Sequence, residues 1–409
     1  MNAGNSKDSG SGRLFTVSFT ALLVGQIISI MGDRLNNIAL IELISIETGR
    51  FRQTTSAFEL SKLALAMTLP SLVLGPLVGA FVDRVRRKRV LITSDVVRGF
   101  AVLTVPFLRP ALPMWTVYGV VALLYFTNLF FLPARCAIVP EIVSREKLMR
   151  ANSMLSLGAT LATIVGFGLG GIVVTHAGWR AALIIDAASY FISAGALALL
   201  VPRAEWSRNE PAPRVSYLSA VREALGEIRK SVGARAGVLI PPVLIMAGTI
   251  AYVLGVALIE ARSERGTMTV GFLISLAGAG MALGCYFAGR VLHHVSREKI
   301  VMVGTLCSIL PLAAVGLTQG FLVAGLAMAL AGFAAGPVFV ASETAIQEET
   351  LPRRQATVFA VRDMLMKSGS ALAAVAAPAV ATFMGLGAAL AVLVCLLVPV
   401  LGVMAYRRS

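Results

Sequence analysis

The stretch from residue 79 to residue 89 constrains this chain more than any other. It joins the end of a long apolar run to five basic residues within six positions, and apolar sequence resumes directly afterwards. Two apolar runs separated by a short basic loop are typical of a chain that leaves a membrane and re-enters it, because Lys and Arg concentrate in cytoplasmic loops. The basic residues are Arg84, Arg86, Arg87, Lys88 and Arg89.

The composition supports a membrane-embedded chain. Hydrophobic residues make up 57% and charged residues 14% of 409 positions, whereas soluble proteins average about 25% charged. The mean hydropathy is +0.82. Each membrane-spanning helix needs about 20 apolar residues, so we predict an all-α membrane protein with twelve transmembrane helices. The twelve runs are 14–46, 58–82, 90–108, 112–134, 151–176, 180–201, 236–260, 268–291, 300–318, 320–343, 356–381 and 384–405.

The basic residues alternate by side of the predicted membrane rather than forming one patch. The net charge is +15, but with a cytoplasmic N-terminus most Lys and Arg residues fall in cytoplasmic segments, as the positive-inside rule requires. This distribution predicts a multi-pass protein of the bacterial inner membrane with both termini cytoplasmic, and it argues against a nucleic-acid partner. The basic residues left outside are Arg50, Arg52, Arg109, Arg180, Arg262 and Arg265.

A weaker copy of the basic loop, at residues 289–299, suggests an internal duplication. Gly289 matches Gly79 and Arg297 matches Arg87, while His293 stands where a second Asp is expected. We therefore divide the chain into a disordered cytoplasmic tail (1–12), a six-helix half (13–201), a linker (202–235) and a second six-helix half (236–409). Apolar residues at helical spacing predict an amphipathic linker helix at the cytoplasmic interface: Leu218, Val221, Leu225 and Ile228.

The first basic loop resembles the signature G-x-L-a-D-r-x-G-r-K of the major facilitator superfamily, with Arg86 in place of its second Gly. The resemblance implies a fold of two six-helix halves with a site between them. It also implies that Asp83 lies at the N-terminus of the eleventh helix, near Ala356 and Thr357, and holds the halves together. The alternative is a loop that only sets topology. In the first case Gly79, Arg84, Arg87 and Lys88 complete the gating signature.

Two further blocks, residues 132–143 and 148–153, together with residues 32–40 and 178–190, resemble the drug:proton antiporter branch that includes macrolide efflux pumps and the enterobactin exporter. This resemblance implies a proton-coupled exporter of amphipathic small molecules, such as drugs or siderophores, that works by alternating access. The intramembrane Arg usual on the fourth helix is absent. Glycines on the fifth helix resemble the antiporter motif, with Phe167 replacing Pro, and otherwise serve as packing residues: Gly166, Gly168, Gly170 and Gly171.

Ionisable residues inside the predicted spans are candidates for transport, because burying a charge in a bilayer is costly. Asp33 and Arg34 interrupt a long apolar run and are followed by Asn37. We expect either a protonatable carboxylate facing a cavity, or a structural role as an Asp33–Arg34 pair or a helix-end cap. Asp186 and Glu260 are weaker candidates, since both are expected near the outer interface.

Two other charged groups carry alternative interpretations. Asp95 and Arg98 are three residues apart on one helix face, and we expect a structural latch near the basic loop, with a direct role in substrate or proton binding as the alternative. Arg362, Asp363 and Lys367 crowd two turns of the eleventh helix. They indicate either a site for an anionic substrate or a second latch.

Several classes of function are excluded by missing motifs. The sequence has no phosphate-binding G-x-x-x-x-G-K-[ST], no H-E-x-x-H and no C-x-x-C pair, so we expect no enzyme activity, cofactor or metal. The predicted partners are an amphipathic small molecule, a proton and membrane lipid, and the protein is expected to be a monomer. A lysophospholipid flippase and a non-transporting receptor or scaffold remain as alternatives.

Overall fold

The computed structural model describes residues 14–47, 74–75, 77–108, 113, 115–201, 217–262, 266–317 and 320–395, and within these residues it contains helices but no strands. The long helices are α1 (Val17–Glu47), α3 (Arg87–Leu108), α4 (Trp115–Ile142), α5 (Leu148–Ala198), α6 (Tyr217–Lys230), α7 (Val232–Arg262), α8 (Gly266–Val291), α9 (Arg297–Leu317), α10 (Phe321–Glu349), α11 (Gln355–Met384) and α12 (Leu386–Cys395). Short 3-10 helices cover Arg145–Lys147, Leu292–His294 and Pro352–Arg354.

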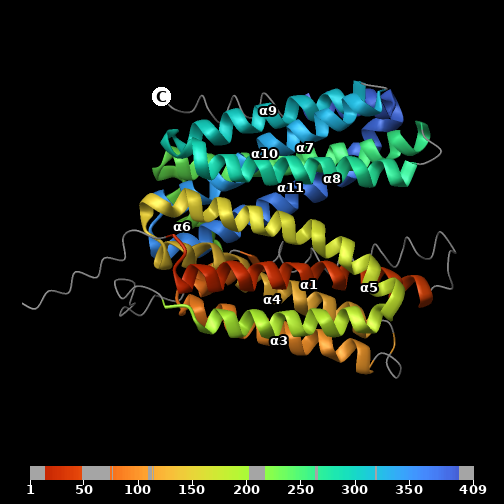
Figure 1. The fold of residues 1–409 in the computed structure, drawn as a ribbon. Helices are drawn as coiled ribbons and strands as arrows, with labels where there is room; N and C mark the ends of the chain where they lie inside the picture. The colour runs from red at the N-terminus through yellow and green to blue at the C-terminus, as the bar shows by residue number, and fades with distance from the viewer. Residues whose placement is uncertain are drawn as a thin grey trace, which may run out of the picture.

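The helices form two bundles (Figure 1). Helices α1, α3, α4 and α5 pack together in one, and α7 to α12 pack together in the other. The bundles meet where α5 contacts α8 and α10 and where α4 contacts α11. Helix α7 begins at Val232, four residues before the predicted start of its span.

Helix α5 contains two of the predicted spans. The runs 151–176 and 180–201 are joined at Gly178, whose φ of 80° is the left-handed conformation that glycine adopts without strain. The chain reverses direction at this residue. The start and the end of α5 therefore both lie at the end of the molecule that carries the loop at residue 83. Within the described residues eight helices are long and apolar enough to span a membrane, with α5 counted once. Most of run 58–82 lies outside the described residues.

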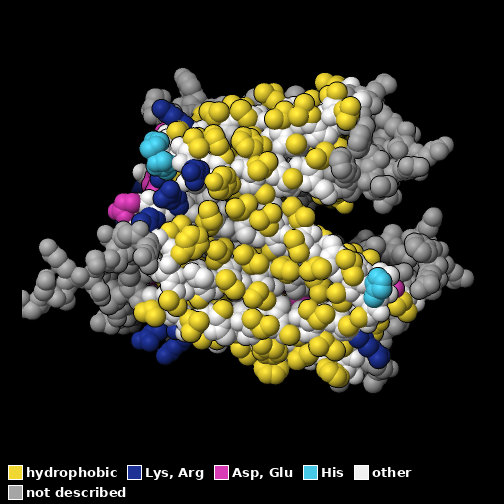
Figure 2. Space-filling view, viewed as in Figure 1, with side chains coloured by type: hydrophobic (Ala, Val, Ile, Leu, Met, Phe, Trp, Pro, Cys, Tyr) yellow, Lys and Arg dark blue, Asp and Glu magenta, His cyan; other side chains and the backbone are white. Residues whose placement is uncertain are grey.

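The surface separates an apolar belt from a basic end (Figure 2). Hydrophobic side chains cover the flanks of both bundles, and Lys and Arg gather mainly at the end where α6 lies. Exposed residues on the flanks include Phe100, Leu322 and Val375. A large exposed apolar surface indicates contact with lipid. We call this end, which carries loop 83–86, α6 and the helix Pro352–Arg354, the basic end.

The linker helix α6 packs more closely than predicted. It contacts α7 and α11, and it buries Ala224, Glu227 and Ile228. Leu225, which the sequence pattern placed on the apolar face, is exposed, because the buried stripe is centred one position away. The side chains of Leu218 and Val221 lie outside the described part of the structure.

Candidate functional site

A cavity of about 730 Å³ lies between the two bundles. Helices α1, α3, α4 and α5 line one wall, and α8 and α10 line the other. This volume lies within the range of roughly 300–1,000 Å³ that is usual for small-molecule sites. Its wall is largely apolar, with charged and amide groups at a few points: Gln26, Asp33, Arg34, Arg98, Asn128, Arg135 and Glu343.

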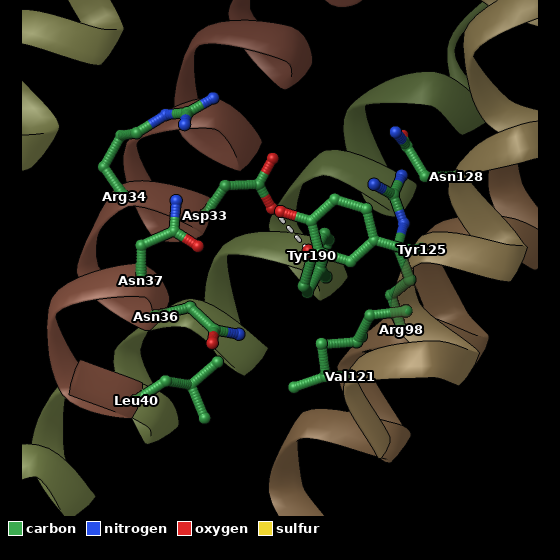
Figure 3. A pocket seen from close by; sticks show the side chains of 11 residues that line it. Asp33, Arg34, Asn36, Asn37, Leu40, Arg98, Val121, Tyr125, Asn128 and Tyr190 are labelled. Atoms are coloured by element: carbon green, nitrogen blue, oxygen red, sulfur yellow. Dashed lines mark hydrogen bonds between the residues drawn. The ribbon is translucent and has the colours of Figure 1, made fainter. Parts of the chain in front are cut away.

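Asp33 faces the cavity from the middle of α1. The hydroxyl of Tyr190, on α5, donates a hydrogen bond to its carboxylate (Figure 3). A second cavity of about 130 Å³ adjoins this pair and also contains Asn37 and Tyr125 in its lining. Of the two sequence hypotheses for Asp33, the geometry favours a carboxylate facing a cavity, since Asp33 and Arg34 form no ion pair in the described structure.

Asp186 is more buried than we predicted. It was expected near the outer interface, but its exposed fraction is 0%, and the Asn36 amide donates to its carboxylate at 2.6 Å. The cause is the close approach of α1 and α5 at Gly32, where a Cβ atom would lie only 2.1 Å from the Ser189 hydroxyl and 2.5 Å from Asp186. Position along its own helix could not reveal that contact.

Arg98 also reaches this site. Its guanidinium is paired with Asp95, as the sequence predicted, but it also stacks on Phe131 and Tyr190, 4.3 Å and 4.6 Å from the ring centroids. Arg98 lines both cavities. It therefore brings to the cluster a basic residue from the third helix, whereas the fourth has none between residues 118 and 131.

Arg34 lies beside Asp33 in the wall of the cavity (Figure 3). Its guanidinium carbon lies 5.3 Å from the centre of the Phe167 ring, and its buried Nε atom has no hydrogen-bond partner within the described structure. Arg34 and Asp33 thus reach the same cavity from adjacent positions on α1 but make separate contacts.

The cavity is closed toward the basic end by an ion pair that the sequence analysis missed. Arg135 on α4 and Glu343 on α10 approach to 3.4 Å, and Arg135 also donates to Gln26 at 3.1 Å. Arg362, which the sequence indicated as either a contact for an anionic substrate or part of a second latch, approaches Glu343 at 3.4 Å. One carboxylate therefore holds two arginines. The signal available was Arg135, within the motif of residues 132–143.

Two other sequence candidates lie away from this site. Asp363 and Lys367 form an ion pair of 2.9 Å on α11, and neither lines the two cavities described above. The side chain of Glu260 lies outside the described part of the structure.

Asp83 occupies the position that the resemblance implied. Its carboxylate accepts hydrogen bonds from the backbone N–H groups of Ala356 and Thr357 at 3.0 Å and 2.8 Å. These groups begin α11, where the helix dipole favours a negative charge. Burial raises the pKa of the Asp83 carboxyl, and the Arg87 charge and these hydrogen bonds oppose that rise.

The small residue at position 79 allows this approach. A Cβ atom at Gly79 would lie 2.7 Å from the Thr357 Cα atom, so only glycine fits without displacement. Gly289 in the second copy meets α5 in the same way, since a Cβ atom there would lie 2.4 Å from the Ser153 hydroxyl. The two related loops therefore both lie against the opposite bundle.

The basic residues of the first loop have different roles. Arg87 is 2% exposed, forms ion pairs with Asp83 and Glu141, and donates to the carbonyl of Pro352 across the bundles. Lys88 was expected to join this network, but it donates to the carbonyls of Ala198 and Leu200 at the end of α5. Arg84 has a buried nitrogen without a partner in the described structure.

The block of residues 148–153 forms hydrogen bonds with the other bundle. The amide of Asn152 donates to Thr344 and Gln347 of α10 at 2.9 Å and 2.7 Å, and Gln347 donates to the carbonyl of Cys136 at 2.7 Å. These buried contacts add a second layer of closure between the loop at Asp83 and the cavity.

Two of the four glycines on α5 have the predicted packing role. A Cβ atom at Gly166 or Gly170 would lie 2.9 Å from Arg34 or 3.2 Å from Ile38 on α1. No described atom lies within 4 Å of such an atom at Gly168 or Gly171. The glycine-rich pattern alone did not show which of the four glycines face α1.

Comparison with known proteins defines the class. The Major Facilitator Superfamily model matches residues 22–374, and the chain belongs to this family of membrane transporters. It is similar to the fucose:proton symporter of E. coli, with a TM-score of 0.77, 12% identity and coverage of 97% of this chain and 100% of that one. A bacterial homologue of ferroportin in an outward-facing state gives a TM-score of 0.71 and 16% identity over 96% and 100% of the two chains. The all-helical major facilitator fold predicted from the sequence is confirmed.

Sequence relatives include efflux proteins. The chain is 27% identical to the uncharacterised transporter YfiS of Bacillus subtilis over 66% of this chain and 63% of that protein. It is 31% identical to the multidrug efflux pump Tap of Mycolicibacterium fortuitum, over 46% and 45%, and 32% identical to macrolide efflux protein A of Streptococcus pyogenes, over 33% and 32%. The matches thus span between a third and two thirds of these relatives. The chain therefore belongs to a family of multi-pass membrane transporters.

Proposed function

We propose that the protein is a secondary active exporter of amphipathic small molecules, driven by proton entry. The observation that carries this proposal is the cavity of about 730 Å³ between the bundles, closed at the basic end and carrying Asp33 in its wall. The apolar wall suits the body of an amphiphile, and the few polar groups suit its orientation. Efflux proteins among the relatives support the direction of transport.

The arrangement of the contacts supports alternating access. The basic end is cytoplasmic under the positive-inside rule, and it is closed by Asp83 at α11, by Asn152 at α10 and by Arg135 at Glu343. Figure 2 shows a notch between the bundles at the opposite end. In this proposal the structure is the outward-facing state, and breaking the three contacts while the notch closes produces the inward-facing state.

Asp33 is the proposed proton site. Its carboxylate lines the cavity that would hold the substrate, and it is bonded to Tyr190 within a cluster that also contains Arg98 and Asp186. A proton from outside neutralises Asp33 and releases a bound cationic group, and loss of that proton to the cytoplasm restores the site. The proton and the substrate then compete for one carboxylate, which is the requirement for exchange.

A flux assay in proteoliposomes tests the proposal. Fluorescent amphiphiles and a fluorescent lysophospholipid are followed in parallel, with and without a pH gradient, for wild type, Asp33→Asn and the control Glu223→Gln, an exposed residue on α6. Gradient-driven movement of the soluble amphiphiles, lowered at least about tenfold in Asp33→Asn only, supports the exporter. Movement of the lysophospholipid alone, without a gradient, would replace it with a flippase.

A further inference from the structure

Of the five charged residues that line the large cavity, all but two, at adjacent positions, form an ion pair within the described structure. Arg98 is paired with Asp95, and Glu343 is paired with both Arg135 and Arg362. These ion pairs leave Asp33 and Arg34, which form no ion pair within the described structure.

The two remaining groups carry opposite charges and share one space. Asp33 and Arg34 both line the large cavity and the small one. Asp33 is bonded to a neutral hydroxyl, that of Tyr190, and Arg34 lies over the Phe167 ring with its Nε atom unbonded. A charge without a partner in an apolar wall is costly, so each group gains from a ligand that supplies the opposite charge.

The Asp33 carboxylate and the Arg34 guanidinium do not form an ion pair with each other. Neighbouring residues on a helix point about 100° apart, and no bond is drawn between the Arg34 guanidinium and the Asp33 carboxylate in Figure 3. A ligand can therefore contact both groups without displacing one from the other. Ile164, Phe167, Ile274 and Phe339 supply apolar surface on the same wall and on the facing one.

We infer that the cavity recognises a zwitterionic head group, with an ammonium at Asp33 and an acidic group at Arg34, on an amphiphile whose apolar body lies between α5 and α8. This inference rests on the proposed function and specifies its substrate class. The ammonium is the group that competes with the proton for Asp33, whereas Arg34 fixes the orientation of the head group. An amino-acid-like compound and a lysophospholipid such as lysophosphatidylethanolamine both carry this chemistry.

A matched set of probes tests the inference on the purified full-length protein. A dansyl-labelled undecyl chain is prepared with an amino-acid, a primary amine, a carboxylic acid or a primary amide head group, and binding is measured by fluorescence titration at pH 7. A charge-assisted hydrogen bond is worth about 1.5–3 kcal/mol. The zwitterion should therefore bind at least about tenfold more tightly than either singly charged probe.

The variants test the Asp33 contact and the Arg34 contact separately. In Asp33→Asn the zwitterion should bind no better than the acid, and in Arg34→Gln no better than the amine. Arg34→Lys, which keeps the charge, should retain part of the preference. The control Arg180→Gln changes an exposed arginine stacked on Trp179 and should keep the wild-type ranking. General misfolding would lower the affinity for all four probes together and cannot produce the reciprocal pattern.

Equal affinity of wild type for the amide and the zwitterion would overturn the inference, as would an equal loss for all probes in both variants. Fluorescent lysophosphatidylethanolamine, titrated in parallel, identifies a lipid source if it alone shows the preference. The flux assay separates the two proposals. Gradient-driven flux without a preference for the zwitterion would support the exporter and contradict the zwitterion site. A preference for the zwitterion without gradient-driven flux would support the site and contradict the exporter.

Discussion

Asp83 and Thr357 join the two bundles at the basic end: the Asp83 carboxylate accepts hydrogen bonds from both the backbone N–H of Thr357, at 2.8 Å, and its hydroxyl, at 2.7 Å. The two residues are 274 positions apart in the chain. A contact made at the start of α11 by a loop of the other bundle must break if the basic end opens.

We predict that Asp83→Asn opens the basic end. Replacing the carboxylate removes hydrogen bonds worth about 1.5–3 kcal/mol, so the open state should become at least about tenfold more populated. The measurement is the rate at which a water-soluble maleimide labels Cys136, which is 1% exposed behind this closure, in a protein whose other cysteines are serine. Lys88→Gln is the matched control, because Lys88 bonds within its own bundle. Equal labelling in wild type and Asp83→Asn would show that the contact does not hold the halves together.

Removing Glu343 should destabilise the protein more than removing Arg135. Glu343→Gln leaves the buried Arg362 and the partly buried Arg135 without a carboxylate, whereas Arg135→Gln leaves Glu343 still paired with Arg362. Breaking a buried ion pair from one side costs about 3–5 kcal/mol, and the surviving pair should reduce that cost for Arg135→Gln. Thermal unfolding in detergent measures the order. A lower Tm for Arg135→Gln than for Glu343→Gln would contradict the proposed sharing.

The docking of α6 should be insensitive to pH over the neutral range. Burial acts to raise the pKa of Glu227, but the hydrogen bond and charge of Lys230 and the Arg354 guanidinium outweigh it and hold this pKa below its usual value, which is about 4.3. A lowered pKa gives a stabilisation that is present above the unfolded pKa and lost as the pH falls through the folded one. Docking should therefore persist from pH 7 to 5 and weaken only below about pH 4.

Hydrogen exchange over residues 221–230, corrected for intrinsic rates, checks this prediction. Glu227→Gln should lower protection at every pH, since it removes the 2.7 Å pair with Arg354. Glu223→Gln should have a smaller effect, because its side chain is 46% exposed and lies 3.6 Å from Arg354. A loss of protection in wild type between pH 7 and 5 would disprove the role assigned to this pair.

Two glycines on α5 should respond oppositely to alanine. A Cβ atom at Gly166 would lie 2.9 Å from Arg34 and 3.0 Å from the Met31 backbone, so Gly166→Ala should cost about 1–3 kcal/mol through overpacking. Gly168 has no described atom within 4 Å of that position, and Gly168→Ala should gain up to about 1 kcal/mol of helix propensity. Thermal unfolding of the two variants in detergent compares them, and similar losses would contradict the close contact at Gly166.

The sequence was most informative where a local pattern determines the structure. Apolar runs predicted the helices, and the break near Gly178 fell between two predicted spans. The contact of Asp83 with α11 was expected only from the family resemblance, because nothing in the residues around Asp83 indicates a partner 274 positions away. The pairing of Asp95 with Arg98 needed only their spacing on one helix.

The site itself depends on contacts between helices that spacing does not encode. Asp186 was placed near water from its position along its own helix, whereas the close approach of α1 and α5 at Gly32 buries it beside Asn36. The pair of Arg135 and Glu343 was missed for the same reason. Each residue is ordinary in its own segment, and only the packing of α4 against α10 brings them together.

The central claim is that a proton and a substrate compete for Asp33 in one cavity. Its most direct test is the release of protons when the amine-bearing dansyl probe binds to purified protein in weakly buffered detergent, followed with a pH indicator from pH 5 to 8. We predict that binding of the probe releases protons from the wild type, at most about one per protein, and none from Asp33→Asn. Saturable binding with no proton released at any pH, or equal release from Asp33→Asn, would contradict the claim.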